Sequence, residues 1–210
     1  MNNMKNPLII FFAFLIFSCD NQEIIYLNSE LSHEERLDDL MSRMTLEEKV
    51  GQMCQYVGLN YLSQSPKNMT AEEILNSDSQ ASYKGFKKKD IAQMVVDGKI
   101  GSFLHVLTPE EANRLQGLAI KSRLKIPLLI GIDAIHGNGM VRGSTIYPSP
   151  ITIASTFDDQ FAFDVGRQTA LEMRATGSHW AFTPNIDVLR DPRWGRVGET
   201  FGEDPKLVTN

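Results

Sequence analysis

An aspartate followed closely by two glycines comes after an apolar run at residues 126–132, IPLLIGI. Asp133 stands directly after this run, and its carboxylate could accept hydrogen bonds from two hydroxyl groups at once. Gly137 and Gly139 would let the backbone turn sharply and approach a ligand. The alternative interpretation is an aspartate that caps a helix or a loop. A nucleotide-binding glycine loop is excluded, because Arg142 stands where its third glycine would be.

A second polar segment runs from Thr183 to Arg196 and holds three arginines and two aspartates within ten residues. Charges at this density are costly to bury unless they pair with one another. The planar fork of an arginine could hold the oxygens of a polar ligand or a neighbouring carboxylate. The segment is therefore either one wall of a ligand site or a self-paired loop that shapes its rim.

Strands and helices alternate in the part of the chain that carries both segments. The pattern predicts strands at 101–107, at 126–132 and from 179, with helices at 90–97, from 109, and at 158–176. This alternation is typical of a parallel sheet with crossover helices, either a barrel or a doubly wound sheet. Both polar segments follow predicted strands, at the sheet edge where such folds build their sites.

The residues before this region predict two short helices and a loop. Ser32 and Thr45 each begin a capping-box pattern, with apolar residues behind them at helical spacing. Residues 58–87 are polar and irregular, which indicates a surface loop or insertion. Cys54 lies in VGQMCQY, interpreted as an apolar helical face with a buried, inert thiol.

Composition narrows the class of protein without naming an activity. The 210 residues hold 21 basic and 26 acidic side chains, a formal net charge of −5, which argues against a nucleic-acid surface. Hydrophobic residues make up 42%, as in an ordinary globular protein rather than a disordered or polytopic membrane protein. Histidine, cysteine and carboxylate residues are not clustered at metal-ligand spacing, so we expect neither a metal nor an organic cofactor.

The first residues have the pattern of an export signal. Lys5 precedes an unbroken apolar run at 8–17, too short to span a membrane, and a small residue then stands before Cys19. This arrangement resembles the lipobox of bacterial lipoproteins, in which the cysteine becomes lipidated. We expect a signal peptide at 1–18, a tether at 19–31, and a membrane-anchored protein in the periplasm or at the cell surface. The alternative is an ordinary signal peptide with a chance cysteine.

Four stretches together resemble the amino-terminal domain of glycoside hydrolase family 3, over residues 32–210. They are TLEEKVGQM, IPLLIGIDAIHGN, YPSPITIASTFD and WAFTPNIDVLRDPRWGRVGETFGEDP. The family includes β-glucosidases, β-xylosidases and related exo-acting enzymes. The resemblance implies an α/β fold, a (β/α)8 TIM-barrel-type domain that is incomplete in this chain, with a second α/β sandwich domain in the full protein.

The resemblance also implies roles for individual residues. Asp133 and Arg196 match residues that bind the hydroxyl groups of the sugar in the −1 subsite. His136 and Arg193 match positions that order the loops behind the sugar. Trp194 could face the sugar, but loop packing is the favoured interpretation.

The residues that break the glycosidic bond are expected elsewhere. Family members retain configuration and use a nucleophilic aspartate and an acid/base glutamate about 5 Å apart. Ser77-Asp78 lies too early to carry the nucleophile, and Asp187 and Glu199 match structural positions. We therefore expect both carboxylates beyond Asn210 and no activity from this chain alone.

The resemblance leaves the precise function open. The main hypothesis is the amino-terminal part of a β-glucosidase-like enzyme that removes terminal non-reducing β-linked sugars from oligosaccharides. A β-xylosidase, or a β-N-acetylhexosaminidase, is the alternative within the family; the latter is disfavoured because that branch generally lacks the RDPRWGR run. A non-catalytic carbohydrate-binding lipoprotein is the alternative from another class. The oligomeric state is left open.

Overall fold

The computed structural model describes residues 24–62 and 88–209, which divide into two compact units, one ending at Arg43 and one beginning at Met44. The predicted signal peptide, Cys19, the Ser77-Asp78 pair and most of the predicted loop at 58–87 lie outside the described residues. Among the residues described, no helix combines the length and the apolar character needed to cross a membrane.

The first unit consists of a 3-10 turn, η1 (Ile25–Leu27), and the helix α1 (His33–Arg43). The capping box predicted at Ser32 is present: the Glu35 amide donates to the Ser32 hydroxyl, and the Ser32 amide donates to the Glu35 carboxylate. Asp39 of α1 accepts two backbone amides of η1, at 3.1 and 3.0 Å, and so fastens the turn to the helix.

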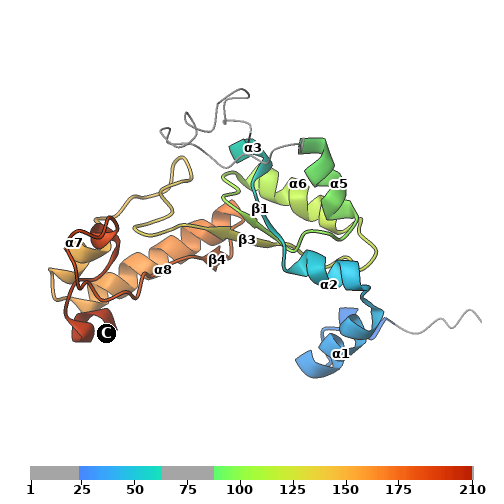
Figure 1. Ribbon diagram of the computed structural model, residues 1–210, viewed down its shortest axis with the longest axis horizontal. Helices are drawn as coiled ribbons and strands as arrows, with labels where there is room; N and C mark the ends of the chain where they lie inside the picture. The colour runs from blue at the N-terminus through green and yellow to red at the C-terminus, as the bar shows by residue number, and fades with distance from the viewer. Residues whose placement is uncertain (1–23, 63–87, 210) are drawn as a thin grey trace, which may run out of the picture. The chain divides into compact units, whose positions relative to one another are not determined.

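The second unit is built on a parallel sheet of four strands in the order β1-β2-β3-β4 (Figure 1). The strands are β1 (Gln55–Val57), β2 (Ser102–Leu104), β3 (Leu129–Ile132) and β4 (Trp180–Ala181). The predicted parallel sheet is confirmed, although each strand is shorter than its apolar run.

The segment around Cys54 was predicted wrongly. It contains the end of a helix and the start of β1 rather than one continuous helical face, and the Cys54 thiol is only half-buried. The cause is pairing with a distant part of the chain: the amides of Gly101 and Ser102 donate to the Cys54 carbonyl, at 3.2 and 3.3 Å, and draw the chain into the sheet. Gly101 permits this close approach, because a Cβ there would overlap the backbone of Gln52.

Helices lie before, between and after the strands. They are α2 (Leu46–Gln52), α3 (Leu59–Leu62), α5 (Lys88–Val96), α6 (Pro109–Ala119), α7 (Pro150–Ala154), α8 (Asp159–Thr176), η2 (Val197–Glu199) and α9 (Pro205–Thr209). Local capping signals fix the ends of three of them, α2, α6 and α8. Thr45 forms the predicted capping box of α2, and Thr108 caps α6 ahead of its first-turn proline. Asp158 is the N-cap of α8 rather than its first residue, and Gly177 ends α8 in the left-handed conformation. The short helix α7 was not predicted.

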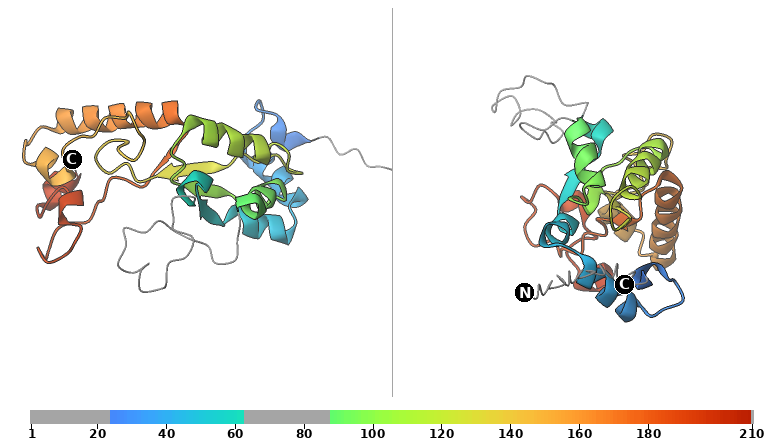
Figure 2. Two further views of the ribbon diagram at one scale, coloured as in Figure 1. Left: turned by 90° about the horizontal axis from the view of Figure 1, so that it is seen from above. Right: turned by 90° about the vertical axis from the view of Figure 1, so that its right-hand side faces the viewer.

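The core of this unit lies between the sheet and helices α5 and α6. Its fully buried side chains include Ile91, Phe103, Leu115 and Ile130. Helices α6 and α8 lie next to each other along one side of the sheet (Figure 2). Burial of each large apolar side chain contributes about 2 kcal/mol, so this packing fixes the strands and the direction in which their carboxyl ends point.

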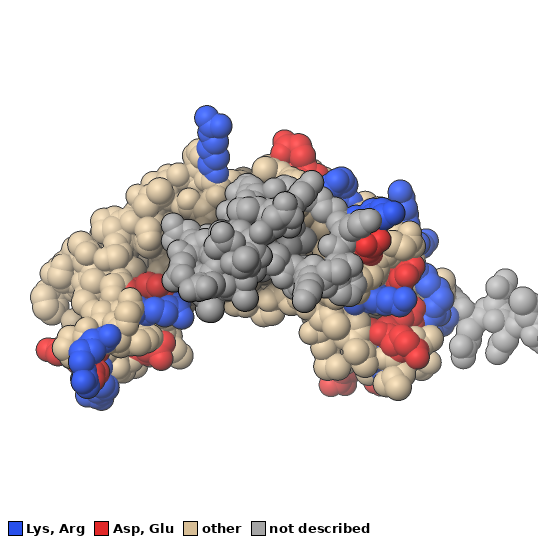
Figure 3. Space-filling model, turned by 45° about the horizontal axis from the view of Figure 1, so that its top comes forward, with Lys and Arg blue, Asp and Glu red and all other residues tan. Residues whose placement is uncertain are grey.

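Lys and Arg side chains are interspersed with Asp and Glu on the face of the molecule in Figure 3. Neighbouring charges of opposite sign cancel over short distances, so the described part of this face carries no extended potential of the kind that steers nucleic acids. The distribution agrees with the net negative charge of the sequence.

Candidate functional site

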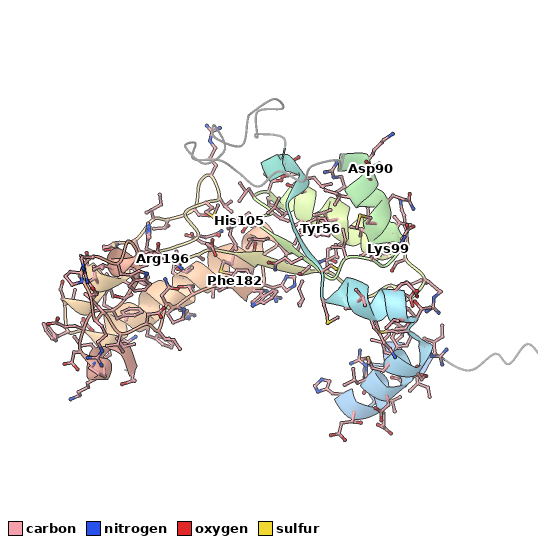
Figure 4. The ribbon with its side chains drawn as sticks, viewed as in Figure 1. Tyr56, Asp90, Lys99, His105, Phe182 and Arg196 are labelled. Atoms are coloured by element: carbon pink, nitrogen blue, oxygen red, sulfur yellow. The ribbon has the colours of Figure 1, made fainter. Side chains whose placement is uncertain are left out.

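Three side chains leave the sheet at the same edge, directly after the carboxyl ends of β2, β3 and β4. They are His105, Asp133 and Phe182, the first and last of which are labelled in Figure 4. The strand register sets this alignment, because Leu104 pairs with Gly131 and Ile132 pairs with Ala181. This is the edge at which parallel α/β folds bind their ligands.

His105 and Asp133 contact each other at this edge. The Nε2 atom of His105 lies 3.4 Å from Oδ2 of Asp133. His105 is buried, at 8% exposure, whereas the Asp133 side chain is 45% exposed. Burial lowers the pKa of His105, and the nearby Asp133 charge partly opposes that effect. The pair therefore presents an exposed carboxylate supported by a buried imidazole.

Sequence reasoning missed His105. The run at 101–107 was treated as a buried strand, and the histidine within it received no role. The signal that could have found it is a titratable side chain at the carboxyl end of an apolar run, the same pattern that identified Asp133. Its backbone φ of 57° is a second sign that only a structure reveals.

The loop after β3 is folded tightly around its glycine. Gly137 has a φ of 101°, and a Cβ there would collide with the Thr145 carbonyl. His136 bonds to Tyr147, in the part of the loop that follows Thr145. Its Nδ1 lies 3.1 Å from the Tyr147 carbonyl, and the Tyr147 amide donates to the His136 carbonyl at 2.8 Å. The ring of His136 thus contacts the loop backbone, as a loop-ordering residue would.

Two further residues fasten this loop to α8. Asn138 is fully buried, and its amide donates to Ser144 Oγ and to Thr176 Oγ1, at 3.2 and 3.0 Å. Glu172 accepts the amide and the hydroxyl of Thr145, at 2.9 and 2.8 Å, and these bonds lower the pKa of its carboxyl. Neither residue was assigned a role from the sequence.

Arg196 belongs to the other polar segment, and its main partner is Glu199. The Nε and Nη2 atoms donate to one carboxylate oxygen of Glu199, at 2.9 and 2.5 Å, and Asn185 donates to the same oxygen at 2.9 Å. The Glu199 contact raises the pKa of Arg196, and the charges of Asp133 and Asp187 add to this. Glu199 therefore holds the Arg196 guanidinium, and the Asp133 charge is a smaller influence on it.

Arg193 forms a surface ion pair. Its guanidinium and its amide donate to the carboxylate of Asp191, with Nε 2.9 Å from Oδ1. The side chain is 89% exposed, so water screens this pair strongly. The predicted self-paired loop is thus present at both arginines. Trp194, between them, is 37% exposed.

A cavity of about 330 Å³ adjoins the loop after β3. Ile135 and Gly137 line it from the loop, Val165 and Met173 from α8, and Phe201 from beyond η2. Its volume is that of a small-molecule pocket, but its lining is largely apolar, and Asp133 is not part of it. Among the described residues, His, Cys, Asp and Glu are nowhere grouped in threes that could hold a metal ion.

A parallel sheet with an imidazole and a carboxylate in contact beyond the carboxyl ends of β2 and β3 has the arrangement of an α/β protein whose polar site lies at its strand ends. The chain belongs to glycosyl hydrolase family 3, whose family model for the N terminal domain matches residues 45–210. The resemblance noted in the sequence is confirmed.

Three similar proteins illustrate the relationship. The chain is 32% identical to a periplasmic β-glucosidase of Salmonella typhimurium over 89% of its length, and 32% identical to a periplasmic β-glucosidase/β-xylosidase of Dickeya chrysanthemi over 87%. It matches the crystal structure of a Listeria innocua β-glucosidase in complex with glucose at 30% identity and a TM-score of 0.61, over 84% of this chain. It spans 21%, 28% and 22% of those three proteins, respectively.

Proposed function

We propose that this chain forms one wall of the sugar subsite of an exo-acting β-glycosidase, with Asp133 and Arg196 as the residues that bind sugar hydroxyls. The observation that supports this most strongly is the placement of an exposed carboxylate at the end of β3, supported by buried His105 and within electrostatic reach of Arg196. A carboxylate accepts from hydroxyls and a guanidinium donates to them, so the two together fit a polyol.

The carboxylates that break the glycosidic bond are proposed to lie after Asn210. Two carboxylates near the site have other partners, since Glu199 holds Arg196 and Asp191 holds Arg193. The chain also spans only about a fifth of the Salmonella relative. We therefore expect no hydrolysis of a nitrophenyl β-glucoside by the chain alone; turnover that disappears in Asp133→Ala would contradict this assignment.

Glucose binding by the chain tests the proposal directly. Titration followed by tryptophan fluorescence is suitable, because Trp180 is in β4 and Trp194 lies in the Arg196 loop. We expect a saturable change that Asp133→Asn weakens about tenfold or more, because a buried sugar hydroxyl would lose its charged acceptor. The matched control is Asp159→Asn, an exposed carboxylate in the first turn of α8, which should bind as the unmodified chain does. Absence of a saturable signal in the unmodified chain would refute the proposal.

Xylose is the second ligand to compare, because the Dickeya chrysanthemi relative is named both a β-glucosidase and a β-xylosidase. Xylose lacks the hydroxymethyl group of glucose, and such a difference alone changes affinity by about 10-fold or more where the site contacts that group. Tighter binding of xylose than of glucose would favour the β-xylosidase alternative.

We also propose that the protein is exported and anchored through lipid on Cys19. The periplasmic names of the Salmonella and Dickeya relatives support export, and the apolar run before Cys19 supports an anchor. Labelling with a fatty-acid analogue should depend on Cys19. If Cys19→Ala still takes up the label and still fractionates with membranes, the anchor is elsewhere.

A further inference from the structure

We propose that His105 is a positioning residue that holds one oxygen of the Asp133 carboxylate and so directs the other oxygen toward a sugar hydroxyl. The inference rests on the proposed sugar site, and its own observation is the 3.4 Å approach of His105 Nε2 to Asp133 Oδ2. Asp133 is the more exposed partner and is free to reach a ligand, whereas His105 is buried behind it.

The backbone of His105 is clamped from both neighbouring strands. Its amide donates to the Gly131 carbonyl of β3 at 2.9 Å. On the other side, the Gly58 amide donates to the Leu104 carbonyl at 2.8 Å, and a Cβ on Gly58 would lie only 2.5 Å from the His105 carbonyl oxygen. These contacts fix the backbone position from which the imidazole extends.

The conformation of His105 is one that side chains rarely adopt. Its φ of 57° lies in the left-handed region, which histidine enters more readily than most residues but which still disfavours any side chain. Residues held in such conformations by their surroundings are concentrated at functional sites. Here the left-handed turn occurs at the end of β2, where the side chain contacts Asp133.

The protonation state of His105 suits this role. Burial lowers the pKa of the imidazole, so near neutral pH it is uncharged and carries a single N–H. A neutral donor orients the carboxylate without cancelling its charge, and a charged acceptor forms the stronger bond to a sugar hydroxyl.

Arg196 does not take over this role. Its charge reaches Asp133, but its Nε and Nη2 atoms donate to Glu199, which holds the guanidinium away from a close pair with Asp133. The other charge near Arg196 is Asp187, which carries the same sign as Asp133 and cannot donate to it. Among the described residues, the imidazole is thus the side chain seated directly against Asp133.

Nitrogen-15 NMR of the histidine rings tests the contact without any ligand. The His105 signal is assigned by its loss in His105→Gln, and its titration is compared in the unmodified chain and in Asp133→Asn. We expect Nε2 to carry the proton, and the pKa of His105 to fall further in Asp133→Asn because an opposing negative charge is lost. The ring signals of the exposed His33 of α1 are the control and should not differ between the two chains. An unchanged His105 titration in Asp133→Asn would overturn the proposal.

Glucose affinity tests the consequence for binding. His105→Ala should weaken glucose binding about tenfold, the effect of losing a hydrogen bond to a charged group. His105→Gln should restore most of it, because a glutamine amide can place a donor near the position of Nε2. Far-UV circular dichroism establishes that both variants are folded.

The NMR titration and the glucose affinities together distinguish failure of the proposed sugar site from failure of the proposed role of His105. If the unmodified chain binds no glucose, the proposed sugar site fails, and the NMR comparison still decides whether His105 positions Asp133. If glucose binds and folded His105→Ala binds it equally well, Asp133 does not need His105 and this inference is wrong. If His105→Ala does not fold, an unchanged His105 titration in Asp133→Asn rejects the inference.

Discussion

The two loops that contribute to the candidate site are held by different kinds of contact. The loop at 133–149, after β3, is fixed by neutral hydrogen bonds from the fully buried Asn138 and by exposed bonds from Thr145 to the Glu172 carboxylate of α8. The loop at 183–200, after β4, is held largely by charged pairs near the surface, of which Arg193 with Asp191 is the most exposed.

This difference makes the loop at 133–149, called the wall below, more rigid than the loop at 183–200, called the rim. Buried hydrogen bonds leave unpaired groups behind when they break, so they resist rearrangement. Exposed ion pairs exchange partners with water and salt at little cost. Asp133 on the first loop can therefore serve as a fixed reference for a ligand, whereas Arg196 on the second can shift from Glu199 toward one.

The largest expected contrast between the loops comes from their glycines. Gly137→Ala places a side chain in a left-handed conformation and against the Thr145 carbonyl, and we expect a loss of at least about 2 kcal/mol in unfolding free energy. Gly195→Ala in the other loop meets no atom within 4 Å and should stay within about 0.5 kcal/mol of the unmodified chain. Urea unfolding followed by fluorescence measures both. Equal effects would mean that the loop after β3 is not the more rigid one.

A pair of asparagines gives the next contrast. Asn138→Ala removes both donors from a fully buried side chain and should cost about 1–3 kcal/mol in the same urea assay. Asn185→Ala removes one bond to Glu199 from a half-buried side chain, and water can replace that bond, so its effect should be smaller. If Asn185→Ala proves the more damaging, the charged loop is the structural one.

The same contrast explains which features the sequence could predict. Helix ends follow from neighbouring residues: Thr45 forms the predicted capping box, and Thr108 and Gly177 also act within one turn of the chain. The strand β1 was missed because three residues carry too little pattern, and its pairing partner lies in β2. Local rules predict local structure, and long-range pairing escapes them.

The site shows the same division. Asp133 was predicted because it directly follows an apolar run, and it lies at the end of β3. His105 was missed because its contact depends on how β2 and β3 align. The bond from Glu172 to Thr145 joins residues 27 positions apart, on a helix whose exposed face gave no sign of it. Sequence spacing placed Asp133 at the end of a strand but gave no sign of the residues that contact it or fasten the loop behind it.

A smaller effect is expected from pH, through the contribution of His105 to the stability of the folded chain. Because burial lowers the pKa of His105 below 6.5, the unfolded chain takes up this proton more readily than the folded chain. The contribution to stability is therefore present above pH 6.5 and is lost as the pH falls through the folded pKa. The urea midpoint of the unmodified chain should drop more between pH 7.5 and 5.5 than that of His105→Gln, which has no such group. Parallel pH profiles would show that His105 is not held neutral.

The smallest effect should come from the rim. Arg193→Ala removes an almost fully exposed ion pair, and we expect the urea midpoint and the glucose affinity to stay as they are in the unmodified chain. Arg196→Ala should likewise leave the urea midpoint nearly unchanged but weaken glucose binding, because its donors are proposed to face the sugar. Glucose affinity should therefore distinguish Arg196→Ala from Arg193→Ala, whereas the urea midpoint should not. A drop in stability in Arg193→Ala would show that surface pairing holds this loop in place, and the rim would then be as fixed as the wall.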